Sequence, residues 1–216
     1  MKKLAAVIVI VPAFAFACTE AVQNGDDAGP DVKQNDAASN DVQQGSDVTP
    51  QPDASGCGFA EDASALAIVV NEIRAKGAEF VELYNPTSAT LDLGGVQVAD
   101  TNTDSGCPKT SEALLFPNGT QLAPGAYLVI DTSSGDAGGP FTNCHDAGIT
   151  CWQATWGISN SNGESVFVLA NGVIATSGYY PPSAVDSGLS WGRIPNGTGS
   201  FTANVPTPGA TNQAAP

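Results

Sequence analysis

The sequence predicts an all-β fold in the form of a two-sheet sandwich, and three observations favour it. The 216 residues include 24 Gly and 15 Pro, a content that disfavours long helices. From residue 57 onward, short runs rich in β-branched and aromatic side chains alternate with clusters of Gly, Pro and Asn. No stretch keeps a helical period of apolar residues, so strands joined by turns are the expected elements.

The first 17 residues have the layout of a secretory signal peptide. Lys2 and Lys3 precede an apolar run over residues 4–17, which is too short to be a permanent membrane-spanning helix. The run ends in a small residue directly before Cys18, which resembles the lipobox of bacterial lipoproteins. In that family the cysteine is acylated and becomes the mature N-terminus. Small residues at positions 15 and 17 also fit an ordinary signal-peptidase site, so secretion is the alternative.

Residues 18–56 are expected to form a disordered, Asp-rich linker. This segment has no aromatic residue and carries Asp-Val or Asp-Ala pairs at regular spacing. Such a composition cannot bury enough apolar surface to offset the entropy lost on ordering the chain. We interpret the segment as a self-repelling tether, with cation binding by its carboxylates as the minor alternative.

The folded domain is expected over residues 57–216. Dipeptides such as Asn118-Gly119 and Asn162-Gly163 supply the positive φ angles that a reversal between strands requires. The runs expected to be strands are 67–73, 79–85, 96–100, 126–131, 165–170 and 173–177. The side chains expected in the core are Ile68, Val70, Phe80, Leu83, Leu128, Ile130, Val166, Val168 and Trp191.

Several of these runs resemble the lamin-tail domain. The similar segments are VVNEI at 69–73, EFVELYNP at 79–86, LDLGG at 91–95, a central hairpin at 116–130, a strand pair at 158–169, and closing segments at 190–197 and 207–212. The resemblance covers residues 66–212 and implies an immunoglobulin-like β-sandwich. It also implies a surface or secreted protein in which the domain is a binding or tethering module, without specifying a ligand.

The five cysteines separate into Cys18 and an even set of four, which an exported chain is expected to oxidise. Three pairings are possible. We expect Cys144–Cys151 to close a short loop and Cys57–Cys107 to hold the leading edge of the domain. A leftover thiol at Cys18 would be unusual, which favours its acylation and a lipid-anchored location at the outer membrane or cell surface.

The sequence from Asp100 to Gly106 has the pattern of a metal-binding loop. Asp100, Asn102 and Asp104 alternate before a Gly bend, so their side-chain oxygens are candidate ligands of a hard cation such as calcium. The spacing is one residue off the EF-hand rule, and no helical pattern flanks it. A polar hairpin loop leading to Cys107 is the competing interpretation.

Carboxylates on the expected strands raise the question of acid–base catalysis. They are Glu72, Glu79 and Glu82, with Arg74, Lys76 and Arg193 as available partners. We expect these glutamates to pair with Arg or Lys, or to face solvent, and we assign them no catalytic role. The single histidine, His145, directly follows Cys144, and adjacent loop residues do not have the geometry of a Cys/His catalytic pair.

The charge and the motifs together predict a function class. A net charge of -15 would repel a nucleic-acid backbone, so nucleic acid is excluded as a partner. We predict a non-enzymatic, membrane-anchored lipoprotein whose domain binds an unknown protein or envelope polymer, or has a structural role in the cell envelope, with calcium as the one candidate cofactor. The alternative is a calcium-binding secreted hydrolase or an accessory subunit of a secreted enzyme.

Overall fold

The computed structural model describes residues 54–132, 135–145 and 148–216. The chain divides into two units, Met1–Ser46 and Asp47–Pro216, and all described residues belong to the second. The expected signal peptide, Cys18 and almost all of the expected linker therefore lie outside the described residues.

The described residues form fourteen β-strands and two 3-10 helices and include no α-helix, which confirms the expected all-β class. The 3-10 helices are η1 (Ala54–Cys57) and η2 (Thr110–Glu112). The strands are β1 (Val69–Arg74), β2 (Phe80–Tyr84), β3 (Leu91–Asp92), β4 (Gln97–Ala99), β5 (Leu114–Leu115), β6 (Gln121–Leu122), β7 (Tyr127–Asp131), β8 (Gly138–Cys144), β9 (Ile149–Gln153), β10 (Glu164–Ala170), β11 (Val173–Tyr180), β12 (Ser190–Ile194), β13 (Ser200–Val205) and β14 (Gln213–Ala214). Neither described helix is long and apolar enough to cross a membrane.

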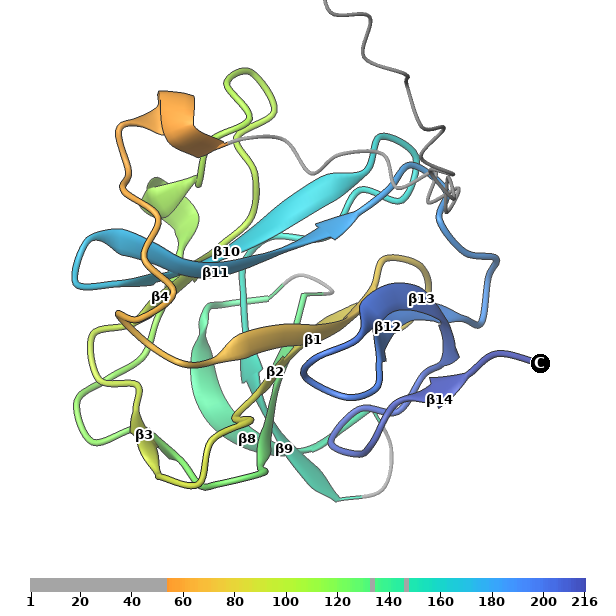
Figure 1. Ribbon diagram of the computed structural model, residues 1–216. Coiled ribbons are helices and arrows are strands. Elements are labelled where there is room, and N and C mark those ends of the chain that lie inside the picture. Colours follow the sequence, from red (N-terminus) through yellow and green to blue (C-terminus); the bar gives the residue numbers. More distant parts are fainter. Residues whose placement is uncertain (1–53, 133–134, 146–147) are drawn as a thin grey trace, which may run out of the picture. The chain divides into compact units, whose positions relative to one another are not determined.

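Two main sheets enclose a shared core, as in a β-sandwich (Figure 1). The larger sheet has the strand order β14-β13-β12-β1-β2-β7-β9-β8, and the smaller one has the order β11-β10-β4-β5. Strands β3 and β6 form a separate two-stranded ladder. The pairings between named strands are antiparallel except that of β7 with β9, which is parallel.

The main core takes one face from each sheet. Side chains two residues apart along a strand point to the same face, so Val81 and Leu83 of β2 are buried in the same cluster as Val166 and Val168 of β10. Burial of a side chain such as Leu83 contributes about 2 kcal/mol. Two expected core residues differ from the other seven. Phe80 is buried in a separate cluster, and Trp191 is only partly buried.

All six expected strands are present, with ends that differ from the expected ones by at most three residues. Residues 158–160, expected to begin a strand pair, instead belong to the loop before β10, which corrects that expectation. Strands β8 and β9 were not expected, because Gly138, Gly139 and Pro140 weaken the local strand pattern of β8. These strands are defined by their pairing with each other and with β7.

Two disulfides cross-link the domain, and their pairing is the one expected from the sequence. Cys57 of η1 is bonded to Cys107 in the loop before η2, across a sequence separation of 50 residues. Cys144 of β8 is bonded to Cys151 of β9, across a separation of 7 residues. The first bond therefore closes a much longer loop than the second.

Removing the Cys57–Cys107 disulfide by paired serine substitution is expected to lower the free energy of unfolding by about 4 kcal/mol. The reason is the long loop, whose closure restricts the unfolded chain. The same change at Cys144–Cys151 is expected to cost about 2.5 kcal/mol, because the closed loop is shorter. Urea unfolding of the two double variants measures both losses, and equal losses would contradict the loop-length argument.

Candidate functional site

Glu72 and Glu82 lie opposite each other on β1 and β2, and neither side chain is exposed. A β-bulge between Val70 and Glu72 places Asn71 and Glu72 together opposite Glu82. Because the neighbours of Glu82 along β2 point into the core, Glu82 points to the other face of the larger sheet. Burial of carboxylates on that face requires another part of the chain to cover them.

Residues 206–212, here called the C-terminal segment, supply this cover. The N–H of Thr207 donates to Oε1 of Glu72 over 3.1 Å, and its hydroxyl donates to Oε2 over 3.0 Å. The N–H of Gly209 donates to Oε2 of Glu82 over 2.7 Å. Each glutamate accepts a backbone N–H of this segment, so the two glutamates hold the C-terminal segment against β1 and β2.

Three asparagines extend this network. The side-chain amide of Asn71 donates to Oε1 of Glu82 over 2.8 Å and to Oδ1 of Asn196 over 3.1 Å. The side-chain amide of Asn212 donates to the backbone carbonyl of Asn71 over 3.1 Å and to a carbonyl of β12 over 3.0 Å. The N–H of Gly197 donates to Oδ1 of Asn71 over 2.9 Å. Asn71 is therefore the central residue that joins β1 and β2 to the residues after β12.

Gly197 is required by this geometry. Its φ is 72°, in the left-handed region that favours glycine. A Cβ atom at this position would lie 2.8 Å from the ring of Tyr84, closer than van der Waals contact allows. The turn expected at Asn196-Gly197 is therefore also the point at which the chain approaches β2.

Burial raises the pKa of both glutamates. The pKa of Glu82 is raised to about 8, chiefly by burial, while the hydrogen bond from Asn71 lowers it and the nearby Glu72 raises it. Burial also raises the pKa of Glu72, against the lowering effect of hydrogen bonds from Ser190 and Thr207. Since the oxygens of both carboxylates are buried and bonded within the protein, a substrate does not reach them in this conformation.

The expected pairing of these glutamates with Arg or Lys is wrong for Glu82, whose hydrogen bonds come from neutral amide groups. Glu72 experiences the charge of Arg74, but its hydrogen bonds also come from neutral donors. Arg193 instead donates to the backbone carbonyls of Val70 and Gly199. The carboxylates therefore belong to a structural network.

The residues of the predicted calcium loop lie in different environments. Asp100 is 7% exposed, whereas Asp104 is exposed. Oδ1 of Asn102 accepts the N–H of Asp104 over 3.0 Å, and the N–H of Asn102 donates to the carbonyl of Cys107 over 2.7 Å, which closes a hairpin. In the described part of the chain, no three His, Cys, Asp or Glu side chains are grouped so that they would hold a metal ion. Calcium binding by this loop stays a prediction.

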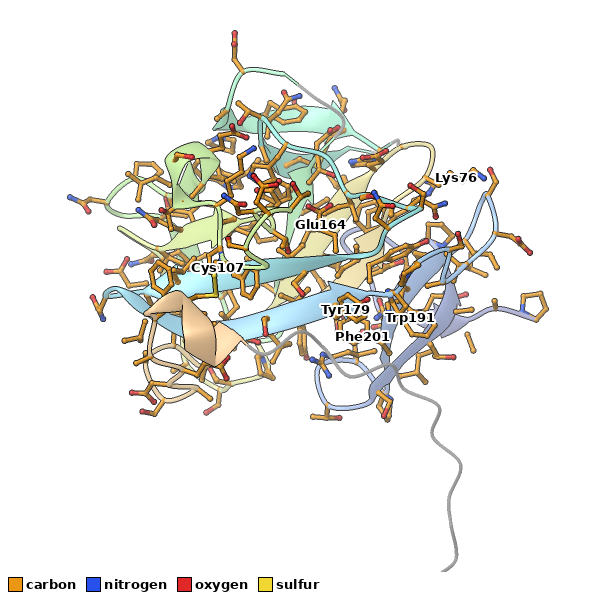
Figure 2. The ribbon with its side chains drawn as sticks, turned by 90° about the horizontal axis from the view of Figure 1, so that it is seen from above. Lys76, Cys107, Glu164, Tyr179, Trp191 and Phe201 are labelled. Atoms are coloured by element: carbon orange, nitrogen blue, oxygen red, sulfur yellow. A yellow bond between two sulfur atoms is a disulfide. The ribbon has the colours of Figure 1, made fainter. Side chains whose placement is uncertain are left out.

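Another acidic residue, Glu164, lies at the start of β10 (Figure 2) and interacts electrostatically with Asp100, although no motif in the sequence marks it. Glu164 is 8% exposed, and its Oε2 accepts the N–H of Ser159 over 2.6 Å. Burial raises the pKa of Glu164 to about 7, and the charge of Asp100 acts in the same direction. The pKa of Asp100 is raised to about 6, chiefly by burial. No local sequence pattern links Glu164 to Asp100, because the pairing register of β4 with β10 is what brings the two residues together.

Glu79 contacts the same loop that Glu164 holds. Its Oε2 accepts the N–H of Ile158 over 3.2 Å, next to the amide that Glu164 binds. Burial raises the pKa of Glu79, and the hydrogen bond from Ile158 lowers it. Like Glu72 and Glu82, Glu79 binds a backbone amide, which keeps the loop before β10 in place.

His145 has no role in a cysteine mechanism. Its side chain is 4% exposed, and its Nε2 lies 3.4 Å from Oδ2 of Asp131. The imidazole ring packs against Phe80 with the ring centroids 5.2 Å apart. The neighbouring Cys144 is in a disulfide, so its sulfur is not a thiolate nucleophile.

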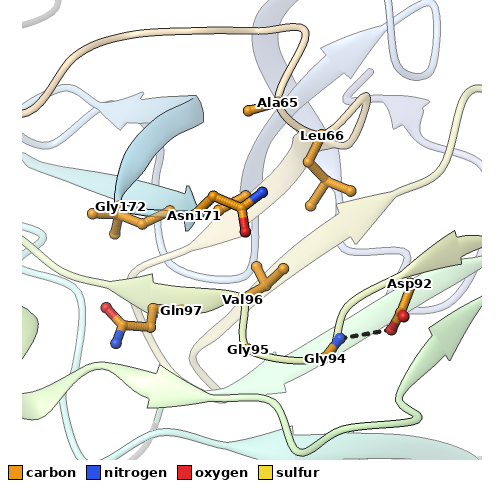
Figure 3. A pocket seen from close by; sticks show the side chains of 11 residues that line it. Ala65, Leu66, Asp92, Gly94, Gly95, Val96, Gln97, Asn171 and Gly172 are labelled. Carbon is orange, nitrogen blue, oxygen red and sulfur yellow. Dashed lines mark hydrogen bonds between the residues drawn. The ribbon is translucent and has the colours of Figure 1, made fainter. Parts of the chain in front are cut away.

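A pocket of about 410 Å³ lies between the turn before β4 and the turn joining β10 to β11 (Figure 3). It is lined by Ala65, Leu66, Asp92, Gly94, Gly95, Val96, Gln97, Leu169, Ala170, Asn171 and Gly172. Asp92 is the ionisable residue among them, and its Oδ1 accepts the N–H of Gly94 over 2.9 Å. With one ionisable side chain in its lining, the pocket has no pair of groups suited to acid–base catalysis.

Three partly exposed aromatic side chains are labelled in Figure 2: Trp191 and Phe201 lie on the paired strands β12 and β13 of the larger sheet, and Tyr179 lies on β11 of the smaller sheet. The rings of Trp191 and Phe201 are stacked, with centroids 6.5 Å apart and planes 12° apart. The guanidinium carbon of Arg193 lies 4.4 Å from the centroid of the Phe201 ring. This surface combines apolar rings with a cation in a chain of strongly negative net charge.

Comparison with known proteins assigns the sandwich to a family. Residues 61–181, more than half of the chain, match the lamin tail domain. No curated protein matches the chain. The lamin tail domain is an immunoglobulin-like, non-catalytic domain, in keeping with the two facing sheets. The match confirms the expected resemblance for the segments up to residue 181, and this chain belongs to the lamin tail domain family.

Proposed function

We propose that this protein is a surface lipoprotein, anchored through Cys18, whose lamin tail domain is a binding or structural module of the cell envelope. The family match supports the module, because the lamin tail domain is an immunoglobulin-like domain without a catalytic role of its own. The two disulfides support export, since they form and persist in oxidising compartments.

The disulfide pairing of the cysteines is the observation that supports the lipid anchor. The four cysteines in the described residues are bonded to one another in two disulfides. Cys18 is the fifth cysteine of the sequence, so this pairing leaves no intrachain disulfide partner for it. Acylation of Cys18, which directly follows the small residue Ala17, accounts for this cysteine. More than one acyl chain is needed for a stable anchor.

Replacing Cys18 by serine is expected to abolish incorporation of labelled palmitate into the protein and to release it from the membrane fraction. The reason is that serine offers no thiol for acylation. The full chain, with its own signal, would be expressed in a bacterium that processes lipoproteins and then fractionated. Globomycin, which blocks removal of lipoprotein signal peptides, is expected to cause accumulation of the unprocessed wild-type chain.

The paired substitution of Cys144 and Cys151 by serine is the matched control, because it removes two thiols that are not proposed to be acylated. This control is expected to keep the palmitate label. Mature wild-type protein found unlabelled in the medium would contradict the anchor, and the protein would then be secreted.

The binding role is tested separately from the anchor. The mature chain carrying Cys18→Ser would be immobilised and exposed to envelope extract, with a reduced and heat-unfolded sample of the same chain as the control. Specific retention of a protein or envelope polymer by the folded chain alone supports the binding module. Identical retention by the folded and unfolded samples would contradict it and would favour a purely architectural role.

A further inference from the structure

Asp100 and Glu164 are brought together by the pairing of β4 with β10. The register pairs Ala99 with Phe167, and Oγ1 of Thr101 both donates to the carbonyl of Ser165 and accepts its N–H. Continuing this register places Asp100 opposite residue 166. Glu164 is then the diagonal neighbour of Asp100, a relation in which cross-strand side chains remain within reach of each other.

Both carboxylates lie on the face of the smaller sheet that points toward the core. Val98 lies two residues before Asp100, and Val166 lies two residues after Glu164, so each valine points to the same face as the carboxylate on its strand. Both valines belong to the main core cluster. Ala99 and Phe167 belong to a different cluster on the opposite face. The two acids therefore close one end of the apolar core, and their exposures of 7% and 8% follow from this position.

One oxygen at this end of the core has no hydrogen-bond donor. Oδ1 of Asp100 is buried and unpartnered, whereas Glu164 accepts the N–H of Ser159. Lys109, whose charge acts on Asp100, forms an ion pair with Glu112 over 2.8 Å. A buried carboxylate oxygen without a donor costs free energy, and this cost is removed when a cation occupies the site.

Beside Glu164 a pocket of about 290 Å³ opens to solvent. Its other lining residues are Thr101, Thr103, Ser159, Asn162 and Gly163. These residues carry hydroxyl, amide and carbonyl oxygens, which are the ligands that a hard divalent cation takes six to eight at a time. The pocket is also large enough to admit water molecules as additional ligands.

We propose that Asp100 and Glu164 form a site for a hard divalent cation, with calcium as the best match, at this end of the sandwich. Oxygens of the adjoining pocket and water complete the coordination. This site shares only Asp100 with the loop predicted from the sequence, and it excludes the exposed Asp104. A cation here would tie β4, β10 and the loop before β10 together, and this proposal does not depend on the lipid anchor.

Calorimetric titration of the full-length protein in detergent with calcium chloride tests the proposal. One calcium ion per chain is expected to bind to the wild type and to raise its melting temperature. Asp100→Asn and Glu164→Gln are each expected to weaken this binding by more than about 10-fold, because each removes a charged ligand. Asp104→Asn, a matched loss of one charge, is expected to leave the affinity within about 2-fold.

Melting curves without calcium establish that each variant is folded, so a loss of calcium binding is not confused with unfolding. Loss of binding in Asp104→Asn with binding retained in Glu164→Gln would overturn the proposal and place the ion in the predicted loop. Equal binding by all three variants would also overturn it, since the ions would then associate with other acidic residues. Absence of heat and of any melting shift in the wild type would exclude the site.

Discussion

Replacing Asn71 by aspartate is expected to destabilise the domain by about 5 kcal/mol, near the upper end of the losses seen for buried uncompensated charges. The side-chain amide of Asn71 donates to Oε1 of Glu82, and both residues are fully buried. Aspartate keeps an acceptor for the N–H of Gly197 but replaces the donor by a second carboxylate oxygen that faces Glu82. Urea unfolding at pH 8 measures the loss of stability.

Two variants separate the charge effect from the loss of hydrogen bonds. Asn71→Ala removes the same hydrogen bonds without adding a charge and is expected to cost about 2 to 3 kcal/mol. Asn118→Asp makes the same chemical change at an exposed turn and is expected to change the stability by less than about 0.5 kcal/mol. A loss of stability under about 1 kcal/mol in Asn71→Asp would show that Asn71 does not form the buried hydrogen bonds described above.

The stability of the domain is expected to fall as the pH rises from about 4.5 to about 8. The pKa of Glu82 is about 8 in the folded state against 4.5 as the ordinary value, so the folded state binds the proton that the unfolded state releases. In this window stability decreases by up to about 1.4 kcal/mol per pH unit, which approaches about 5 kcal/mol in total. The raised pKa of Glu72 adds a contribution of the same sign.

Urea unfolding in calcium-free buffer at pH 5, 6.5 and 8 measures this dependence. Glu82→Gln replaces the glutamate by a neutral group of similar shape and is expected to reduce the slope of the profile without removing it, because the raised pKa values of Glu72, Glu164 and Asp100 act in the same direction. The variant is also expected to be less stable than the wild type at pH 5. Glu61→Gln, at an exposed position, is expected to keep the slope of the wild type. A wild-type stability that rises between pH 5 and pH 8 would contradict the burial of a protonated carboxyl group at Glu82.

The strands and turns of the sandwich were predictable because their signals are local. Short runs of β-branched and aromatic residues mark β2 and β10 in any context, and positive φ at Gly119 and Gly197 follows from the need to reverse the chain. The pairing of the cysteines was also predictable, since the even set of four cysteines allows only three arrangements. Strands β8 and β9 were not predictable, because pairing with neighbours outweighs a Gly-rich composition that disfavours strands.

The candidate sites depended on contacts that a sequence pattern does not contain. The period of two along β2 shows that Glu82 points away from Val81 and Leu83, and this alone suggested a solvent-facing carboxylate. The hydrogen bond between Gly209 and Glu82 spans 127 residues of sequence, and it is this distant segment that buries the glutamate.

The sequence by itself determined the class of fold, the family, and the expectation of an exported, lipid-anchored chain, because composition, alternation and motif order are carried along the chain. The tertiary structure decided which carboxylates are buried and which groups meet them. Asp100 and Glu164 are neighbours only through the register of β4 with β10, and Glu72 and Glu82 are buried only beneath the C-terminal segment. The physical reason is that burial and pKa depend on the atoms around a group, and those atoms come from distant parts of the chain.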